Sequence, residues 1–205
     1  MYIPSFNKFE DQQEAIAFMQ RYSFATIVSV KDGLPIATHL PFLVKQVDNK
    51  VILSSHFAKA NPQSADIINT NALVIFTEPH AYISPKHYEK EESVPTWNYL
   101  AVHAYGRCVL LDGEENKAAL LKETIQYYDA DYLKQWDSLP DKYKQNMMKG
   151  IVAFEIVVDD LQAKAKLSQN RTEKERENII GALDAAENIN EQEIAEYMKS
   201  LKRVD

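Results

Sequence analysis

Residues 54–63, SSHFAKANPQ, gather hydroxyl, imidazole, ammonium and amide groups directly after an apolar run. A helix that begins at Asn61, with Pro62 in its first turn, would present unpaired N–H groups and a positive dipole end to an anion. Ser55 and Lys59 would add a hydroxyl donor and a cation at the same place. The segment has no glycine-rich loop, so it is not a P-loop. It is compatible with a phosphate site or with a capped helix beside a surface lysine.

A second pair of candidate residues, Trp97 and Asn98, stands at the head of the strand-like segment TWNYLAVHAYGRCVLL. Cofactor sites are mostly apolar with a few well-placed polar groups, so an indole and an amide at this position suit a planar ligand. The alternative is a half-buried tryptophan in the wall of a β-sheet.

A third group lies in residues 164–171, KAKLSQNR, where Lys166, Ser168, Gln169 and Asn170 follow one another without an apolar pattern. This basic and amide-rich stretch stands out because the chain as a whole is acidic. It indicates contact with an anion, and the alternative is a linker whose side chains are solvated.

The histidines and the cysteine form no metal or nucleophile motif. No histidine pair has the i,i+4 spacing of a helical zinc site, and the single cysteine, Cys108, has no cysteine partner. No G-x-S-x-G or Cys/His signature is present either. We therefore expect no metal site, and the sequence assigns no catalytic residue. The histidines are His39, His56, His80, His87 and His103.

Direct binding to nucleic acid is not expected, because the formal net charge is -7 and such binders carry a basic patch. Residues 172–205, a predicted helix pair, contain five basic and nine acidic residues. The second of these helices would present Glu191, Glu193 and Glu196 to the phosphates, which excludes it as a recognition helix.

Length and composition predict a soluble globular protein. The 205 residues are 45% hydrophobic and 26% charged, enough for one domain with a substantial core. A lone cysteine fits a reducing compartment, and the N-terminal residues resemble no signal peptide. No apolar run reaches the roughly 20 residues that span a bilayer. We therefore expect a cytoplasmic protein without a membrane segment.

The elements that must position the candidate residues are mostly strands. Tight turns, including a KDG hairpin signal at Gly33, join the first three strands into an antiparallel meander. Gly106 indicates a bulge or bend, and residues 78–95 form a long loop of the kind that is often functional. The predicted strands cover residues 24–30, 35–46, 51–57, 72–78, 96–111 and 150–161.

Helices are predicted between and after these strands, and Thr172 with Glu175 forms a capping box. The order is not the βαβ alternation of a parallel sheet, so the pattern favours an α+β antiparallel barrel with peripheral helices. We expect a main domain over residues 1–170 and a helical appendage over residues 171–205. The predicted helices cover residues 10–22, 60–70, 112–133, 140–149, 172–186 and 190–201.

Taken together, the segments MYIP, GLPIATHLPF, HFAKANPQ, AYISP, VPTWNYLAVHAYG and KLSQN resemble the PaiB-type family of FMN-binding proteins, named for a negative regulator of protease synthesis and sporulation. They run in this order from residue 1 to about residue 170. The resemblance implies a split antiparallel β-barrel of the pyridoxamine-phosphate-oxidase type, and a homodimer with FMN between its subunits.

The resemblance also implies cofactor contacts, grouped by their position in the motifs. Thr38, His39, Ser55, His56 and Lys59 would line the phosphate and ribityl end, and Asn61 belongs to the same motif. Trp97 and Asn98 would lie near the isoalloxazine. Lys166, Ser168, Gln169 and Asn170 would reach the flavin, either from the same chain or from the partner chain.

Several positions depart from the family pattern. Glu78 stands where a glycine is usual, His87 where a tryptophan is usual, and Ser64 where an aromatic residue is common. Phe6 and Asn7 are also unusual after MYIP. Most of these positions concern the substrate side of the pocket rather than the phosphate end.

Three functions follow as alternatives. The first is an FMN-binding protein that acts as a flavin-dependent oxidoreductase. The second is a negative transcriptional regulator that acts indirectly. The third is a haem-binding or haem-degrading protein on the same fold.

Overall fold

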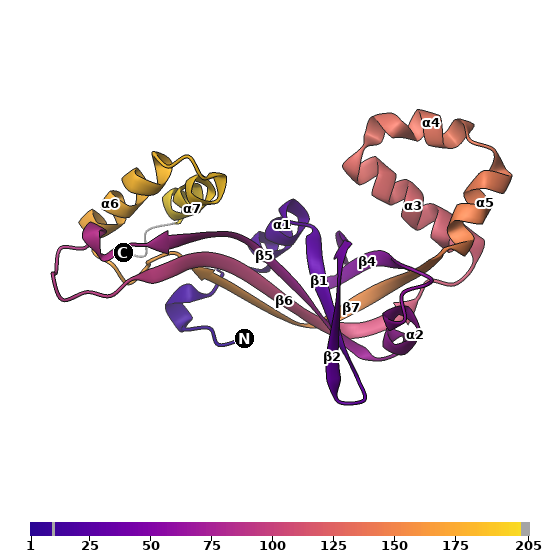
Figure 1. The fold of residues 1–205 in the computed structure, drawn as a ribbon, viewed down its shortest axis with the longest axis horizontal. Helices are drawn as coiled ribbons and strands as arrows, with labels where there is room; N and C mark the ends of the chain where they lie inside the picture. Colours follow the sequence, from indigo (N-terminus) through magenta and orange to yellow (C-terminus); the bar gives the residue numbers. More distant parts are fainter. Residues whose placement is uncertain (10, 202–205) are drawn as a thin grey trace. The chain divides into compact units, whose positions relative to one another are not determined.

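The structure, a computed structural model, describes residues 1–9 and 11–201. Within these residues, seven strands and seven α-helices alternate irregularly, with three short 3-10 helices; Figure 1 shows their arrangement. The strands are β1 (Phe24–Lys31), β2 (Leu34–Pro41), β3 (Leu43–Val47), β4 (Lys50–Ala58), β5 (Asn71–Ile83), β6 (Thr96–Leu110) and β7 (Ile151–Lys166). The α-helices are α1 (Gln12–Arg21), α2 (Gln63–Ile67), α3 (Glu114–Tyr128), α4 (Leu133–Ser138), α5 (Asp141–Lys149), α6 (Glu173–Asp184) and α7 (Ile189–Ser200). The 3-10 helices are η1 (Ser5–Asn7), η2 (Pro85–His87) and η3 (Ala130–Tyr132).

The strands form one sheet in the order β2-β1-β5-β6-β7-β4-β3. The pairs β1–β2, β1–β5, β3–β4 and β4–β7 are antiparallel. The predicted meander of the first three strands is instead two hairpins, β1–β2 at one edge of the sheet and β3–β4 at the other. Strands β2 and β3 are the two edges of the sheet, so it is an open sheet rather than a closed barrel. The α+β class is therefore confirmed.

The predicted hairpin turn between β1 and β2 is present. Asp32 and Gly33 both have positive φ, at 51° and 79°, which is the backbone of a type I′ turn. Lys31 pairs directly with Leu34 in the ladder, so the turn sets the register of the whole hairpin.

The prediction of one strand over residues 35–46 was wrong, because the chain breaks between β2 and β3. The break is at Phe42, whose side chain is fully buried and packs edge-on against Phe76 and Phe154. Its N–H donates to the carbonyl oxygen of Ser23 instead of joining a strand ladder. Because the Phe42 side chain is buried in the core, the one expected strand is divided into β2 and β3. The sheet therefore has seven strands rather than the six expected.

Two predicted irregular segments are partly strand. Strand β5 continues through residues 78–83 of the expected loop, and η2 follows at once. Strand β7 continues to Lys166 and takes up the first three residues of the expected linker 164–171. Both extensions show that strand pairing overrides the charged and proline-rich composition that favoured a loop.

Gly106 allows β6 to pass very close to β7, which refines the expected bulge or bend. A Cβ at this position would lie 2.1 Å from the carbonyl oxygen of Val157 and 2.8 Å from Cγ2 of Ile156. No side chain fits in that space, so the glycine is required by close backbone approach rather than by its φ angle.

The helix predictions hold with shifted boundaries. Helix α2 has only five residues and begins at Gln63, later than expected. Helix α3 ends at Tyr128 rather than continuing to residue 133. The capping box of α6 is confirmed, since the Thr172 hydroxyl accepts from the Glu175 N–H and the Glu175 carboxylate accepts from the Thr172 N–H.

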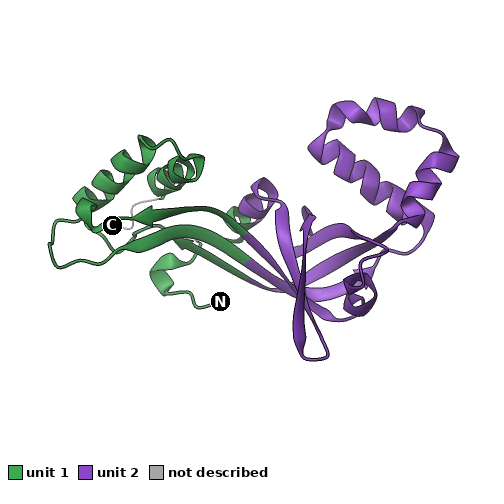
Figure 2. Ribbon diagram, in the orientation of Figure 1, with its two compact units in different colours: residues 1–15, 77–102, 162–205 green, residues 16–76, 103–161 purple. Residues whose placement is uncertain are grey.

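The chain folds into two compact units, coloured separately in Figure 2. Unit 1 contains residues 1–15, 77–102 and 162–205, and unit 2 contains residues 16–76 and 103–161. Helices α6 and α7 lie against each other within unit 1. The separate division into residues 1–170 and 171–205 stays a prediction.

Candidate functional site

The predicted cofactor residues are shared between the two units. Thr38, His39, Ser55, His56, Lys59 and Asn61 belong to unit 2, whereas Trp97, Asn98, Lys166, Ser168, Gln169 and Asn170 belong to unit 1. Each group is therefore described within its own unit.

In unit 2, Thr38 and Asn61 are joined through a residue that the sequence did not single out, Gln63. The Thr38 hydroxyl donates to Oε1 of Gln63 at 2.6 Å and accepts from Nδ2 of Asn61 at 3.0 Å. Asn61 Oδ1 accepts from the Gln63 N–H at 3.0 Å. Gln63 is buried, and its amide also donates to Ser29 Oγ at 3.1 Å. This network fixes the chain between β4 and α2 against the β1–β2 hairpin.

Ser55 and His56 follow each other on β4 and therefore point to opposite faces of the sheet. Ser55 is buried, and its hydroxyl donates to the carbonyl oxygen of Pro41 at 2.6 Å. His56 is half-buried, and burial lowers the pKa of its imidazole, which favours the neutral ring. Among the described residues, the His56 ring makes no hydrogen bond or ion pair.

Lys59 follows β4 with an exposed side chain, and only its backbone is held, through a 2.8 Å bond from its N–H to the Gly150 carbonyl. In the described part of the chain, its ammonium group has no ion-pair partner. The five-residue helix α2 is too short to supply the dipole field that the sequence suggested. The open cation of Lys59 and the ring of His56 are therefore the groups of this segment that an anion can reach.

His39 faces away from this network. It neighbours Thr38 on β2 and so projects from the opposite face, where its ring stacks on Phe24 with centroids 6.3 Å apart. Both side chains are exposed.

In unit 1, the strand alternation of β6 separates Trp97 from Asn98. Trp97 is 51% exposed, and its ring lies 5.8 Å from those of His80 and Tyr82, forming an aromatic surface. Asn98 is fully buried on the other face. Its Oδ1 accepts from Ser168 Oγ at 3.0 Å, so its amide ties β6 to the end of β7.

The residues after β7 form a tight turn rather than a loose linker. Ser168 is buried with a positive φ of 59°. The Gln169 side chain accepts from the Leu167 N–H at 2.8 Å and donates to the Ala165 carbonyl at 2.5 Å. Asn170 is exposed. Of the four predicted residues here, Gln169 uses its side-chain amide to stabilise the turn itself.

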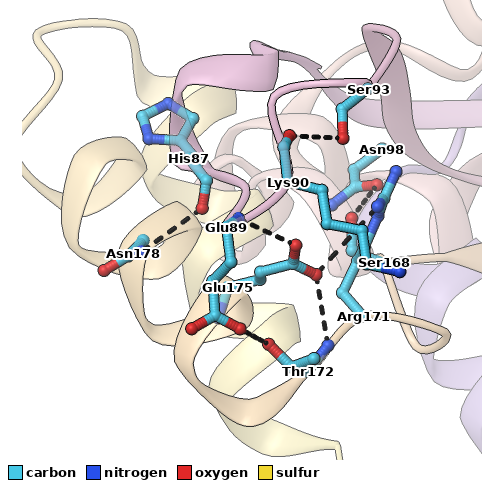
Figure 3. A network of polar contacts seen from close by, with 10 residues as sticks. All are labelled: His87, Glu89, Lys90, Ser93, Asn98, Ser168, Arg171, Thr172, Glu175 and Asn178. Carbon is cyan, nitrogen blue, oxygen red and sulfur yellow. Dashed lines mark hydrogen bonds and ion pairs between the residues drawn. The ribbon is translucent and has the colours of Figure 1, made fainter.

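A polar network continues from this turn into α6 (Figure 3). The buried Glu175 carboxylate accepts from the Glu89 N–H at 3.0 Å, and the Glu89 carboxylate accepts from the Thr172 hydroxyl at 3.1 Å. Asn178 donates to the His87 carbonyl at 3.3 Å. The segment between β5 and β6 is thus anchored to the first helix of the C-terminal pair.

Unit 1 also contains a cavity of about 380 Å³ that brings Asn98, Lys166, Ser168 and Asn170 together. Burial lowers the pKa of Lys166; nearby Tyr99 opposes this effect and Lys164 adds to it. Sequence reasoning missed Lys164, although its position two residues before Lys166 on a strand is the signal for a shared face. The remaining lining residues are Tyr2, Pro4, Phe6, Asn7, Val94, Pro95, Thr96, Tyr99, Lys164 and Arg171.

No cluster of three or more potential metal ligands occurs among the residues that the structure describes. The same residues include no helix long and apolar enough to cross a membrane.

Comparison with solved structures places this architecture among split-barrel folds. It resembles the FAD and haem binding protein of Mycobacterium smegmatis, with 13% identity, a TM-score of 0.61, and coverage of 78% of this chain and 73% of that one. It also resembles the flavocytochrome Anf3 of Azotobacter vinelandii, with 14% identity, a TM-score of 0.62, and coverage of 80% and 72%. At such identities the likeness shows the fold alone.

The sequence defines the family. Residues 1–160 match the family described as "Putative FMN-binding domain". The "Protease synthase and sporulation protein PAI 2" of Bacillus subtilis (strain 168) is 41% identical over 203 residues, which are 97% of this chain and 97% of that protein. The chain belongs to this PaiB-type family of FMN-binding split-barrel proteins. Both the family resemblance and the expected cofactor, FMN, are confirmed.

The residues present fit such a cofactor in kind. A phosphate needs a cation and hydrogen-bond donors, which the open Lys59 ammonium and the His56 ring can supply in unit 2. A flavin ring needs flat apolar contacts, and the exposed indole of Trp97 offers one in unit 1.

Proposed function

We propose that this protein is a homodimeric FMN-dependent oxidoreductase. The match of residues 1–160 to an FMN-binding domain carries the proposal. When bound, FMN supplies electron transfer, and the protein supplies binding, orientation and electrostatics.

The first set of residues that we assign to FMN lies in unit 2. Lys59 and His56 would hold the phosphate, because their side chains make no polar contact with other described residues. Thr38, Asn61 and Ser55 would support them, since their hydrogen bonds fix β2, β4 and the segment before α2. We include His39 as a predicted contact from the exposed face of β2.

The second set lies in unit 1 and is tested separately. Trp97 would contact the flavin ring through its exposed face, and Asn98 would act through its bond with Ser168. We retain Lys166, Gln169 and Asn170 as predicted contacts of the flavin.

A homodimer is supported by the exposed apolar side chains of the edge hairpin. Phe24, Val30 and Leu34 are 68%, 67% and 69% exposed, and β2 has no fully buried residue. Exposed apolar side chains gathered at the edge of a sheet usually mark an association surface. Sedimentation of the purified chain should give twice the chain mass, and Leu34→Lys should shift it towards the monomer.

The experiment that tests the oxidoreductase is spectroscopic. The purified chain, saturated with FMN and freed of excess, should show a flavin absorption spectrum that bleaches on anaerobic addition of NADH or NADPH and returns with oxygen. A bound flavin that neither nucleotide nor dithionite reduces would contradict redox turnover. A chain that takes up no FMN would contradict the proposal at its first step.

A regulatory function is the second candidate, favoured by the name of the relative from Bacillus subtilis. Its action would be indirect, since the chain carries a net charge of -7. A mobility-shift assay at low salt should show no complex with DNA, and a tight, salt-sensitive shift would overturn the indirect version.

Haem binding on the same fold is the third alternative, and the haem named for the Mycobacterium smegmatis protein motivates its test. A Soret band on haem addition, lost in one histidine variant, would establish it.

We also propose a cytoplasmic location, which is supported by the single cysteine. Cell fractionation would test it.

A further inference from the structure

The cavity of unit 1 contains more positive charge than its surroundings balance. It is lined by Lys164, Lys166 and Arg171, and no aspartate or glutamate is among its described lining residues. This is unusual in a chain with a net charge of -7. The cavity is therefore electrostatically suited to an anion.

Lys164 is the clearest example of an unbalanced positive charge in this cavity, because its side chain is buried and the residue is only 8% exposed. Its ammonium lies 5.9 Å from the ring centre of Tyr2 and 5.2 Å from that of Tyr99, and it donates to the Tyr2 carbonyl at 3.2 Å. Within the described residues, no carboxylate forms an ion pair with it. Buried lysines are rarely found unpaired, since burial without a counter-charge is costly.

Lys166 is held in a similar way by a hydrogen bond to the hydroxyl of Thr96. An ammonium group has three donors, and each of these two lysines uses one on a protein acceptor. The remaining donors are available to a ligand in the cavity.

Arg171 adds a third cation at the edge of the network in Figure 3. Its guanidinium stacks on the Tyr88 ring at 3.7 Å, and its nearest carboxylate, that of Glu175, is 4.0 Å away. At that distance the ion pair is weak, and Glu175 is already engaged by the backbone N–H groups of Glu89 and Thr172.

The cavity also has aromatic and apolar lining residues, beside polar ones such as Asn98 and Ser168. Tyr2, Phe6 and Tyr99 line the cavity beside the two lysines. Its volume of about 380 Å³ is near the lower end of small-molecule sites, roughly 300–1,000 Å³. A single-ring compound suits this space better than a three-ring flavin with its ribityl phosphate.

We propose that this cavity is the substrate side of the flavin site and binds, beside the FMN that Lys166 and Asn170 are assigned to contact, a small aromatic anion carrying a phosphate or carboxylate group. This inference rests on the proposed function. The anion would pair with the lysines and the ring would lie among the aromatic walls. Because an opposing charge offsets the desolvation of a buried ammonium, the ligand would also relieve the cost of burying Lys164.

The test is calorimetric titration of the FMN-loaded protein with phenyl phosphate, with benzoate and with inorganic phosphate. We expect saturable binding of phenyl phosphate, one per chain, at about 1 mM or tighter. Inorganic phosphate should bind more weakly than phenyl phosphate, because it lacks the ring that contacts the aromatic walls. The comparison with benzoate distinguishes a phosphate from a carboxylate ligand.

The variant Lys164→Met keeps the apolar stem between the two tyrosines and removes the charge. It should weaken phenyl phosphate binding at least tenfold. Lys174→Met removes the same charge from an exposed position on α6 and should change binding less than twofold. If Lys164→Met loses its native circular dichroism, Arg171→Gln, with an expected loss of about tenfold, takes its place.

Three results would overturn the proposal: no saturable binding, equal binding by Lys164→Met and the unmodified chain, or displacement of FMN by phenyl phosphate. The last would assign the cavity to the flavin. Flavin fluorescence recorded on the same samples shows separately whether FMN binds, so failure of the proposed function is distinguished from failure of this site.

Discussion

Replacement of Lys59 by methionine should weaken FMN binding, because Lys59 is the open cation of the segment between β4 and α2. A hydrogen bond to a charged partner contributes about 1.5–3 kcal/mol, and solvent exposure places Lys59 at the lower end of that range. Each 1.4 kcal/mol is a factor of ten in affinity. We therefore expect Lys59→Met to raise the dissociation constant of FMN about tenfold.

The same strand offers a matched control. Lys50 begins β4 and is also exposed, and β4 continues for eight further residues to Ala58. At about 3.3 Å per residue this is about 26 Å, well beyond the roughly 8–10 Å over which salt screens exposed charges. Lys50→Met removes the same charge from the protein, but at a distance where salt screens it. It should therefore change the affinity for FMN by less than about twofold.

Both variants are measured by titrating FMN fluorescence against the flavin-free protein at two ionic strengths. The affinity of the unmodified chain should fall with salt, and the salt dependence of Lys59→Met should be smaller, because one ionic contact is missing. Equal losses in Lys59→Met and Lys50→Met would show that only net charge matters. An unchanged affinity in Lys59→Met would refute the assignment of this lysine to the phosphate.

Three further predictions concern the fold. Gly106→Ala should lower the free energy of unfolding in urea by about 1–3 kcal/mol, because its Cβ would meet the Val157 carbonyl oxygen, whereas an unchanged midpoint would refute the close approach. Cys108 is fully buried and burial raises its pKa to about 12, so a thiol reagent should label it only as fast as the protein unfolds, and rapid labelling of the native chain would contradict this. Burial lowers the pKa of His56 and His103 from 6.5, so the unfolded chain binds more protons and stability should fall as pH drops through that value. Urea midpoints at pH 7.5 and about 5.5 test this, and His56→Gln should lose less stability on acidification than the unmodified chain.

Local signals in the sequence were enough for much of the fold. The KDG turn specifies positive φ at Asp32 and Gly33, and these two residues set the register of the β1–β2 hairpin. The pair Thr172 and Glu175 similarly marks the beginning of α6. Such features depend on residues a few positions apart, so they can be predicted without knowledge of the remaining chain.

Strand length was less predictable. The charged residues after Leu161 and the proline of β5 favoured irregular backbone, yet both segments are paired in the sheet. Pairing depends on what the neighbouring strand provides, and that strand is distant in the sequence. For the same reason the burial of Phe42, which separates β2 from β3, could not be predicted from its local pattern.

The sequence by itself determined the family and the cofactor, because the order of short motifs along the chain is specific even where each motif is weak. Tertiary structure alone decided what the polar groups do. Ser55 and Asn98 are buried and bonded within the fold, whereas Lys59 is left open. Lys164 became a candidate ligand group because the fold brings it against Tyr2, 162 residues away. The burial of a charge is a property of the folded chain, since it depends on residues that only folding brings together.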